Sequence, residues 1–153
     1  MPILIDQMQK IKRYCAYQER SHYEVRGKLI ELQVYGEDLE ETIGILIEEN
    51  YLNEERFACA LARGKFSLKK WGRLKIRQAL KQHQVSDYCI KKAFQEIDEA
   101  DYQKTFDALA EKKWEELRSE KNRFTKMSKL QHFLLYKGYE SEYIHDFFKR
   151  KQL

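Results

Sequence analysis

The sequence predicts an all-α protein of three tandem three-helix repeats that form an elongated, curved array. A single proline and only six glycines in 153 residues leave helices almost uninterrupted. Apolar residues recur at three- and four-residue spacing along most of the chain. Leu29, Leu80 and Leu134 lie 51 and 54 residues apart, and each precedes a turn signal and a short capped segment. A near-constant period of this size indicates stacked supersecondary units.

The first repeat is expected over residues 1–52. An apolar stripe predicts a helix over residues 3–19. Ser21, followed by Glu24, forms a capping box that opens the second helix, and Gly36 is expected to close it. A similar start signal opens an amphipathic third helix that ends near residue 50; the signal residues are Asp38 and Glu41.

The second repeat is expected over residues 53–97. Asn53 is placed to cap the fourth helix, whose predicted buried stripe is Phe57, Leu61 and Leu68. Gly72 separates this helix from the fifth, and Ser86 is expected to cap the sixth. Ile76 and Leu80 of the fifth helix are expected to face inward.

The third repeat is expected over residues 98–153 and begins with a longer helix. The eighth helix is expected to end at Gly138 and to bury a stripe of Phe124, Met127, Leu130 and Leu134. Ser141 is expected to cap the ninth helix.

The composition, with 35% charged and 42% hydrophobic residues, is typical of a soluble folded protein. Cys15, Cys59 and Cys89 fall on or beside apolar stripes, which predicts buried small side chains rather than disulfides or a zinc site. The N-terminus lacks a signal-peptide pattern, and no segment has the roughly 20 apolar residues of a membrane span. We therefore expect a cytoplasmic monomer without a membrane partner.

Charge is distributed unevenly. The three expected repeats carry net charges of −4, +7 and +1. The stretch from Arg56 to Ser86 holds nine basic residues and no carboxylate, although such charges are usually diluted by acidic residues three or four positions away. This pattern predicts an anionic partner, either the phosphates of a nucleic acid or an acidic protein surface; a merely solvated helix face is the alternative.

Six residues of this stretch are candidate contacts with DNA or a protein partner: Arg63, Lys69, Lys70, Arg73, Arg77 and Lys81. Arg73, Arg77 and Lys81 recur at four-residue spacing and so are expected to form one ridge on a helix. Trp71 and Phe66 lie among the charges and suit either base stacking or a core. The ridge lacks the interleaved Asn and Gln residues that are typical of contacts with base edges, so sequence-specific base contacts are not predicted.

Catalysis is not predicted. The Gly64–Lys65 pair lacks the first glycine and the Ser or Thr of a phosphate-binding loop. The four histidines lack HxxxH and HExxH spacing, and Glu142 with His145 is the one plausible di-metal pair on a single helix. No catalytic residue, metal site or cofactor is expected, and the chain is interpreted as a binding protein.

The middle third resembles the RecX regulatory proteins. The resemblance is carried by Tyr51-Leu52-Asn53-Glu54-Glu55-Arg56-Phe57-Ala58, by Lys70-Trp71-Gly72-Arg73-Leu74-Lys75-Ile76-Arg77-Gln78-Ala79-Leu80, and by Val85-Ser86 before a short helix. Glu54 stands where the family usually has aspartate. Gln84 stands where a glycine is usual, so a non-glycine residue must close that helix.

The resemblance implies a function. RecX proteins bind the bacterial RecA recombinase, usually in the groove of its DNA filament, and restrain its ATPase and strand-exchange activities in DNA repair, recombination and the SOS response. A non-enzymatic modulator of the recombinase filament is therefore the leading hypothesis. A stand-alone, sequence-nonspecific nucleic-acid-binding protein is the alternative, and an enzyme is a distant third.

Overall fold

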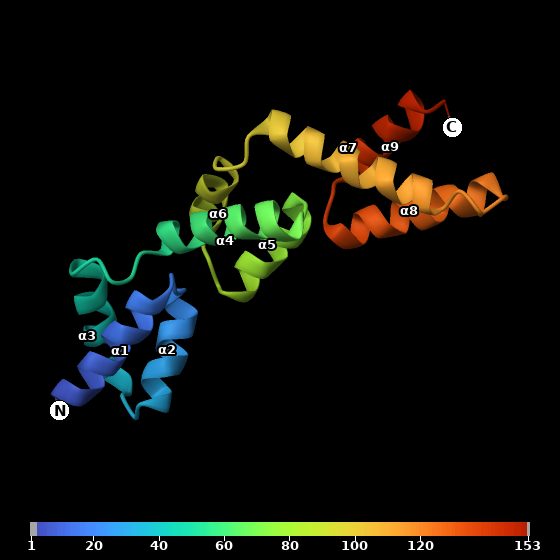
Figure 1. Cartoon of the computed structure of the whole chain (residues 1–153). Coiled ribbons are helices and arrows are strands. Elements are labelled where there is room, and N and C mark those ends of the chain that lie inside the picture. The colour runs from blue at the N-terminus through green and yellow to red at the C-terminus, as the bar shows by residue number, and fades with distance from the viewer. Residues whose placement is uncertain (1–2, 153) are drawn as a thin grey trace. The chain divides into compact units, whose positions relative to one another are not determined.

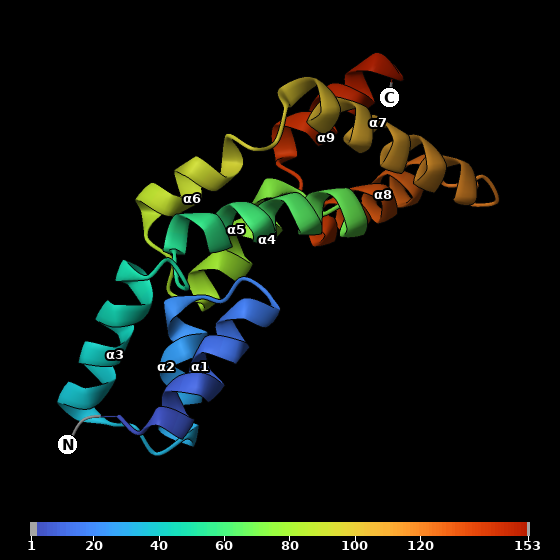
Figure 2. The same cartoon turned by 60° about the vertical axis from the view of Figure 1, so that its left-hand side comes forward.

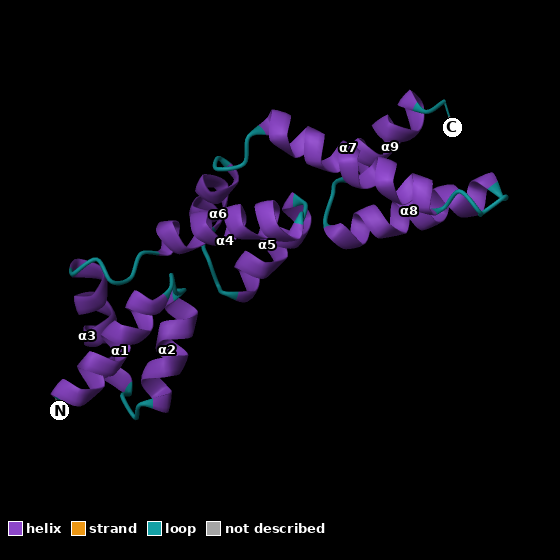
Figure 3. Ribbon diagram, viewed as in Figure 1, coloured by secondary structure: helices purple, strands orange, loops and turns teal. Residues whose placement is uncertain are grey.

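The computed structural model describes residues 3–152, and this part of the chain forms nine α-helices and no strand (Figures 1 and 3). The all-α prediction is confirmed. The helices are α1 (Ile5–Tyr17), α2 (His22–Glu31), α3 (Gly36–Glu48), α4 (Glu54–Lys69), α5 (Arg73–Gln82), α6 (Asp87–Phe94), α7 (Glu99–Glu116), α8 (Arg123–Lys137) and α9 (Ser141–Arg150).

The chain divides into two compact units. Unit 1 contains residues 3–61 and 80–93, and unit 2 contains residues 62–79 and 94–152. Helices α4 and α5 each contribute residues to both units. Figure 2 shows the course of the two helices. The predicted repeat boundaries at residues 52 and 97 stay a prediction.

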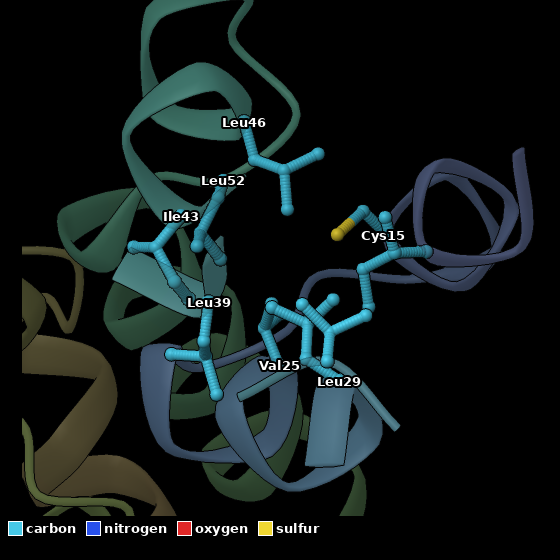
Figure 4. Close-up of a cluster of buried hydrophobic side chains, with 9 residues drawn as sticks. Cys15, Val25, Leu29, Leu39, Ile43, Leu46 and Leu52 are labelled. Atoms are coloured by element: carbon cyan, nitrogen blue, oxygen red, sulfur yellow. The ribbon is translucent and has the colours of Figure 1, made fainter. Parts of the chain in front are cut away.

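Unit 1 is built around a core shared by α1, α2 and α3. Figure 4 shows side chains from the three helices pointing toward one another, joined by Leu52 from the following segment. The fully or almost fully buried members of this core are Ile11, Val25, Leu29, Leu46 and Leu52. Cys15 is buried at its edge, which confirms its predicted role as a small apolar side chain.

Polar residues begin several helices as predicted. The Ser21 hydroxyl accepts a hydrogen bond from the Glu24 amide at 3.0 Å, and the Glu24 carboxylate accepts one from the Ser21 amide at 2.9 Å. The Asn53 side chain accepts from the Arg56 amide at 2.8 Å, and Ser86 accepts from the Cys89 amide at 3.3 Å. These caps satisfy backbone donors that the first turn of a helix leaves without a partner.

The second helix of each expected repeat ends in the same way. In each turn one residue takes a left-handed conformation, and the next, buried residue donates its amide to the carbonyl of the repeat leucine five positions earlier. The left-handed residues are Gln33, Gln84 and Gly138; the amide donors are Val34, Val85 and Tyr139; and the acceptors are Leu29, Leu80 and Leu134. This shared turn is the physical basis of the 51- and 54-residue spacing in the sequence.

Two predicted boundaries in the first repeat are wrong. Gly36 does not close α2, because Gln33 supplies the left-handed residue with φ of 66° and Gly36 is already the first residue of α3. The start signal at Asp38 and Glu41 is likewise misplaced by three residues, since Tyr35 rather than Asp38 holds the cap position and α3 begins at Gly36. A non-glycine residue in the turn concealed the true end of α2.

Three predictions on side-chain roles also fail. Leu68 and Phe124 were expected on buried stripes, but they are 82% and 80% exposed. Both lie one residue from a helix end, Leu68 in α4 and Phe124 in α8. Ser141 is the first residue of α9 rather than its cap, and Glu140 holds the cap position without a side-chain hydrogen bond.

Unit 2 packs α7, α8 and α9 together, and its core is rich in aromatic rings. Tyr102, Phe106, Tyr139 and Phe147 are buried, and the centroids of Tyr102 and Tyr139 lie 5.2 Å apart. Phe66, at the α4 end, stacks on Tyr102 at 5.8 Å, so its role is packing rather than base stacking.

Backbone contact between two glycines joins the start of α5 to the end of α8 within unit 2. The Gly72 amide donates to the Lys137 carbonyl at 2.8 Å, and the Leu74 amide donates to the Gly138 carbonyl at 2.9 Å. A Cβ on Gly72 would lie 2.4 Å from the Gly138 carbonyl. The predicted structural role of Gly72 follows from this close approach.

Within residues 3–152, every helix is too short or too polar to cross a membrane.

Candidate anion-binding surface

The basic stretch from residue 56 to residue 86 is partly neutralised by carboxylates that lie outside it. Arg56 pairs with Glu19 at 2.6 Å, Arg63 with Glu96 at 2.8 Å, and Lys81 with Asp87. The pairs of Arg63 and Lys81 are exposed, and such pairs contribute little stability. Both basic groups can therefore exchange their carboxylate for that of a partner at small cost.

Arg73 has a different environment. Its guanidinium pairs with Glu99 and, at 3.0 Å, with Glu140, and it lies 3.8 Å above the centre of the Tyr102 ring. Its amide donates to the Tyr102 hydroxyl at 2.9 Å, and the guanidinium also reaches the Tyr143 hydroxyl at 3.3 Å. Only 21% of the Arg73 side chain is exposed. Arg73 thus joins the start of α5 to the first turn of α7 and to the region around the start of α9.

The ionisation of this network follows from its contacts. Burial disfavours the charged guanidinium, but hydrogen bonds to Tyr143, Glu140 and Glu99 outweigh it and raise the pKa of Arg73. Burial and the hydrogen bond to Glu140 raise the pKa of Tyr102. The hydrogen bond from Tyr143, with help from Arg73, lowers the pKa of Glu99. The network is therefore a set of satisfied ion pairs at neutral pH.

Lys69 and Lys70, at the end of α4, have a fixed backbone and unpaired side chains. Lys70 is in the left-handed conformation with φ of 60°, and its carbonyl accepts a hydrogen bond from the Tyr139 hydroxyl at 2.7 Å. The Lys69 carbonyl accepts from the Lys137 ammonium at 3.1 Å. Both side chains are exposed, and neither has a carboxylate partner within residues 3–152.

Two further lysines, which the sequence analysis did not select, surround the ring of Trp71. The ammonium groups of Lys65 and Lys75 lie 4.9 and 4.7 Å from the Trp71 ring centre. Lys75 also lies 4.2 Å from the ring of Tyr136, which is 71% exposed. The sequence left open whether Trp71 stacks on a base or packs in a core. In the structure Trp71 is half-buried, with two ammonium groups near its ring.

Lysines of α7 extend this basic region. A groove of about 320 Å³ is lined by three lysines and three other residues: Lys70, Lys104, Lys112, Thr105, Ala108 and Leu109. No carboxylate lines it. No sequence pattern indicates this grouping, because Lys104 and Lys112 lie more than 30 residues from Lys70 and alternate with acidic residues along α7.

We call the group around the end of α4 the α4-end cluster; it consists of Lys65, Lys69, Lys70, Trp71, Lys75, Lys104, Lys112 and Tyr136. Of the six predicted contact residues, Lys69 and Lys70 belong to it. Arg77 lies apart, with its guanidinium 5.1 Å from the Phe94 ring and no carboxylate partner in the described part of the chain. Lys81 belongs to unit 1.

The chemistry of this surface is that of binding. Across residues 3–152, no three His, Cys, Asp or Glu side chains are grouped as metal ligands would be. Ammonium groups beside exposed aromatic rings attract anions and offer a face for stacking. Fold and surface together are those of an all-α protein with a basic surface that suits anionic partners.

Comparison with known proteins gives the family. The chain matches the model of the second three-helix domain of RecX at residues 53–93 and that of the third at residues 98–148. It is 31% identical to Regulatory protein RecX of Shigella dysenteriae over 147 residues, which are 90% of this chain and 86% of the relative. It is 30% identical to that of an Escherichia coli strain over 93% of this chain and 89% of the relative. The chain belongs to the RecX family of regulatory proteins, which are not enzymes.

Solved structures agree with the fold. The crystal structure of RecX from Lactobacillus salivarius matches with a TM-score of 0.82 and 24% identity, covering 96% of this chain and 97% of that one. A second crystal structure of regulatory protein RecX matches with a TM-score of 0.79, also at 24% identity, covering 92% of this chain and 70% of that one.

Proposed function

We propose that the protein binds the bacterial RecA recombinase filament on DNA and restrains its ATPase and strand-exchange activities in repair and recombination. The observation that carries the proposal is family membership combined with the unneutralised α4-end cluster, whose residues all lie in the two matched family domains. The side chains of Lys69 and Lys70 are exposed to solvent, and hydrogen bonds to their carbonyls fix the backbone that carries them. A backbone that is already fixed loses little conformational entropy when a partner binds.

The proposed contacts divide into two groups. Lys69, Lys70 and Arg77 meet the acidic or phosphate groups of the filament directly, because they have no carboxylate of their own in the described chain. Arg63 and Lys81 contribute by exchanging an exposed carboxylate for a filament anion. Arg73 is a positioning residue, since its guanidinium already pairs with Glu99 and Glu140 and fixes the start of α5.

The direct test is co-sedimentation with the cognate recombinase assembled on DNA. The wild-type protein is expected to sediment with the filament, and the variant Lys69→Glu/Lys70→Glu/Arg77→Glu is expected to stay in the supernatant. A matched control changes three exposed lysines outside the cluster to the same charge, Lys91→Glu/Lys121→Glu/Lys149→Glu. Retained sedimentation of the first variant, or equal loss by the control, contradicts the proposed surface.

The alternative function is sequence-nonspecific binding of free nucleic acid. It is favoured by the lysines around Trp71 and Tyr136, which suit stacking of unpaired bases. Filament binding together with a lowered ATPase rate decides for the recombinase modulator, whether or not naked DNA is also bound. Equal affinity for naked and recombinase-coated DNA, with no change in ATPase rate, decides for the alternative.

A further inference from the structure

The first 52 residues have a net charge of −4, but their charges are segregated. All six basic residues lie on α1, on α2 or between them: Lys10, Lys12, Arg13, Arg20, Arg26 and Lys28. Six of the ten carboxylates lie on α3 or at its end: Glu37, Asp38, Glu40, Glu41, Glu48 and Glu49. The net charge therefore conceals a basic side of this segment.

Two of the six basic residues pair with carboxylates on α3 or at its end. Lys12 pairs with Glu49 at 3.0 Å, and Arg26 makes a two-pronged pair with Glu40. Both cations therefore already face a carboxylate from another part of unit 1. The remaining four have no contact with α3 that explains their presence.

Those four cations line one pocket of unit 1. The pocket has a volume of about 390 Å³ and is lined by Lys10, Arg13, Tyr14, Tyr17, Arg20, Lys28 and Leu32. No carboxylate lines it. We call this site the α1–α2 pocket.

The cations of the α1–α2 pocket are weakly neutralised. Lys10 and Lys28 pair with Asp6 and Glu31 at 3.1 and 3.5 Å, in exposed pairs within one helix. Such pairs contribute only a few tenths of a kcal/mol, so they do not hold the ammonium groups against a phosphate. Arg13 is exposed and has no partner within residues 3–152.

Arg20 and the two tyrosines give the pocket a fixed shape. The Arg20 guanidinium donates through Nε to the Tyr14 carbonyl at 2.9 Å and lies 3.8 Å from the centre of the Tyr14 ring. Its contact with Glu24 is longer, at 3.9 Å. Tyr17 is 82% exposed at the pocket, 5.9 Å from Arg20, and no core packing accounts for its ring.

We propose that the α1–α2 pocket binds single-stranded nucleic acid, with Lys10, Arg13 and Lys28 contacting phosphates and Tyr17 stacking on a base. Ammonium and guanidinium groups beside an exposed ring are the combination that binds unpaired strands without sequence preference. A purely acidic peptide would use the cations and leave the Tyr17 ring without a role. The site lies outside both matched family domains, needs no recombinase, and so stands or falls separately from the proposed function.

The test uses the full chain and a fluorescein-labelled 15-nucleotide oligo(dT), with binding followed by fluorescence anisotropy over a range of salt concentrations. Lys10→Glu/Arg13→Glu is expected to weaken binding at least about tenfold and to reduce the log–log salt slope by about 1.4, because two phosphate contacts on a single strand are lost. The matched control Lys91→Glu/Lys149→Glu makes the same change in net charge outside the pocket, and less than half that loss is expected.

The ring is tested separately. Tyr17→Ala is expected to weaken oligo(dT) binding roughly 5- to 100-fold, whereas Tyr17→Phe keeps the stacking face and stays within about twofold of wild type. Circular dichroism verifies that both variants fold. Both are expected to fold, because the Tyr17 side chain is exposed and its loss does not disturb the core.

Three results overturn the proposal. The first is unchanged oligo(dT) affinity in the Lys10→Glu/Arg13→Glu variant. The second is an equal loss in the Lys91→Glu/Lys149→Glu control. The third is a pocket variant that keeps oligo(dT) binding but loses binding to poly-glutamate, which assigns the pocket to an acidic protein instead.

Discussion

Gln84 closes α5 in the left-handed conformation, with φ of 59°, a geometry in which a Cβ costs about 1 kcal/mol. Gln33 closes α2 in the same way, whereas Gly138 closes α8 without this cost. Two of the three equivalent turns therefore carry a strain that the third avoids. The strain is tolerated because the following residues, Val34 and Val85, are buried.

The Gln84 turn gives a first prediction. Gln84→Gly is expected to raise the free energy of unfolding by about 0.5–1 kcal/mol, because glycine reaches the left-handed region freely. The control Gln78→Gly, an exposed site in the middle of α5, is expected to lower it by about 0.5 kcal/mol. Urea denaturation measures both changes, and the same sign in the two variants would refute the explanation.

Arg73 and Arg77 give a second prediction, because they lie one turn apart on α5 in different environments. Arg73→Ala is expected to lower the free energy of unfolding by about 2–4 kcal/mol, since it removes the largely buried guanidinium that pairs with Glu140 and Glu99 and lies over the Tyr102 ring. Arg77→Ala is expected to cost about 0.5 kcal/mol, since only its contact with Phe94 is lost. Equal effects in chemical denaturation would show that the Arg73 network has no structural role.

Glu99 gives a third prediction, on pH. Its pKa is lowered in the folded protein by Tyr143 and Arg73, so its stabilising contribution is present above its unfolded pKa near 4.5 and is lost as the pH falls through the lower folded value. Glu99→Gln should therefore lose less stability than wild type between pH 5 and pH 3, by no more than about 1 kcal/mol because Glu99 is largely exposed. Glu142→Gln is the control, and unfolding curves that shift alike for both variants would contradict this assignment.

At the scale of helices, the contact between α5 and α8 depends on the absence of two side chains. Gly72 and Gly138 let the backbones meet, and a Cβ on Gly138 would lie 2.4 Å from the Lys75 Cβ and 2.6 Å from its amide nitrogen. Gly138 also has φ of 98°. Two amides of the α5 start then reach two carbonyls of the α8 end.

This junction gives a fourth prediction. Gly72→Ala and Gly138→Ala are each expected to destabilise the protein by more than about 2 kcal/mol, because the clash is with backbone atoms that cannot rotate away. Gly64→Ala, in α4 with open space around it, is expected to stabilise by about 0.5–1 kcal/mol. Thermal unfolding ranks the three variants, and a stable Gly138→Ala protein would show that the junction is not tight.

Helices were predictable from the sequence where local chemistry decides them. Ser21, Asn53 and Ser86 cap helices through hydrogen bonds to residues three positions on, and this spacing is visible in the sequence. The end of α2 was not predictable, because a glutamine occupies the turn and its left-handed conformation has no sequence signal. The exposure of Leu68 was also hidden, since it depends on whether another helix covers that end of α4.

The candidate site was predictable only in part. The sequence showed that no carboxylate lies between residues 56 and 86, but the partners of Arg63, Arg73 and Lys81 come from later segments: Glu96, Glu99, Glu140 and Asp87. A stretch without carboxylates in the sequence can still lie close to carboxylates from other segments of the folded chain. Lys104 and Lys112 show the converse. They lie on a helix rich in acidic residues, but the fold places them with Lys70 along a groove that no carboxylate lines.

At the scale of the whole molecule, the charges fall into three groups. The α4-end cluster in unit 2 and the α1–α2 pocket in unit 1 are both free of lining carboxylates, while the acidic residues gather on α3 and in the ion pairs of unit 2. A net charge of +4 therefore understates the attraction that either basic surface exerts on phosphates. The central claim is that the unpaired cations of the α4-end cluster and Arg77 bind the recombinase filament.

The DNA-dependent ATPase rate of the cognate recombinase tests this claim most directly. The wild-type protein is expected to lower the rate, and the control Lys91→Glu/Lys121→Glu/Lys149→Glu is expected to lower it as well. Lys69→Glu/Lys70→Glu/Arg77→Glu is expected to leave the rate at its uninhibited value while keeping the wild-type unfolding curve. Full inhibition by this folded variant, or no effect of a large excess of wild-type protein, would contradict the account.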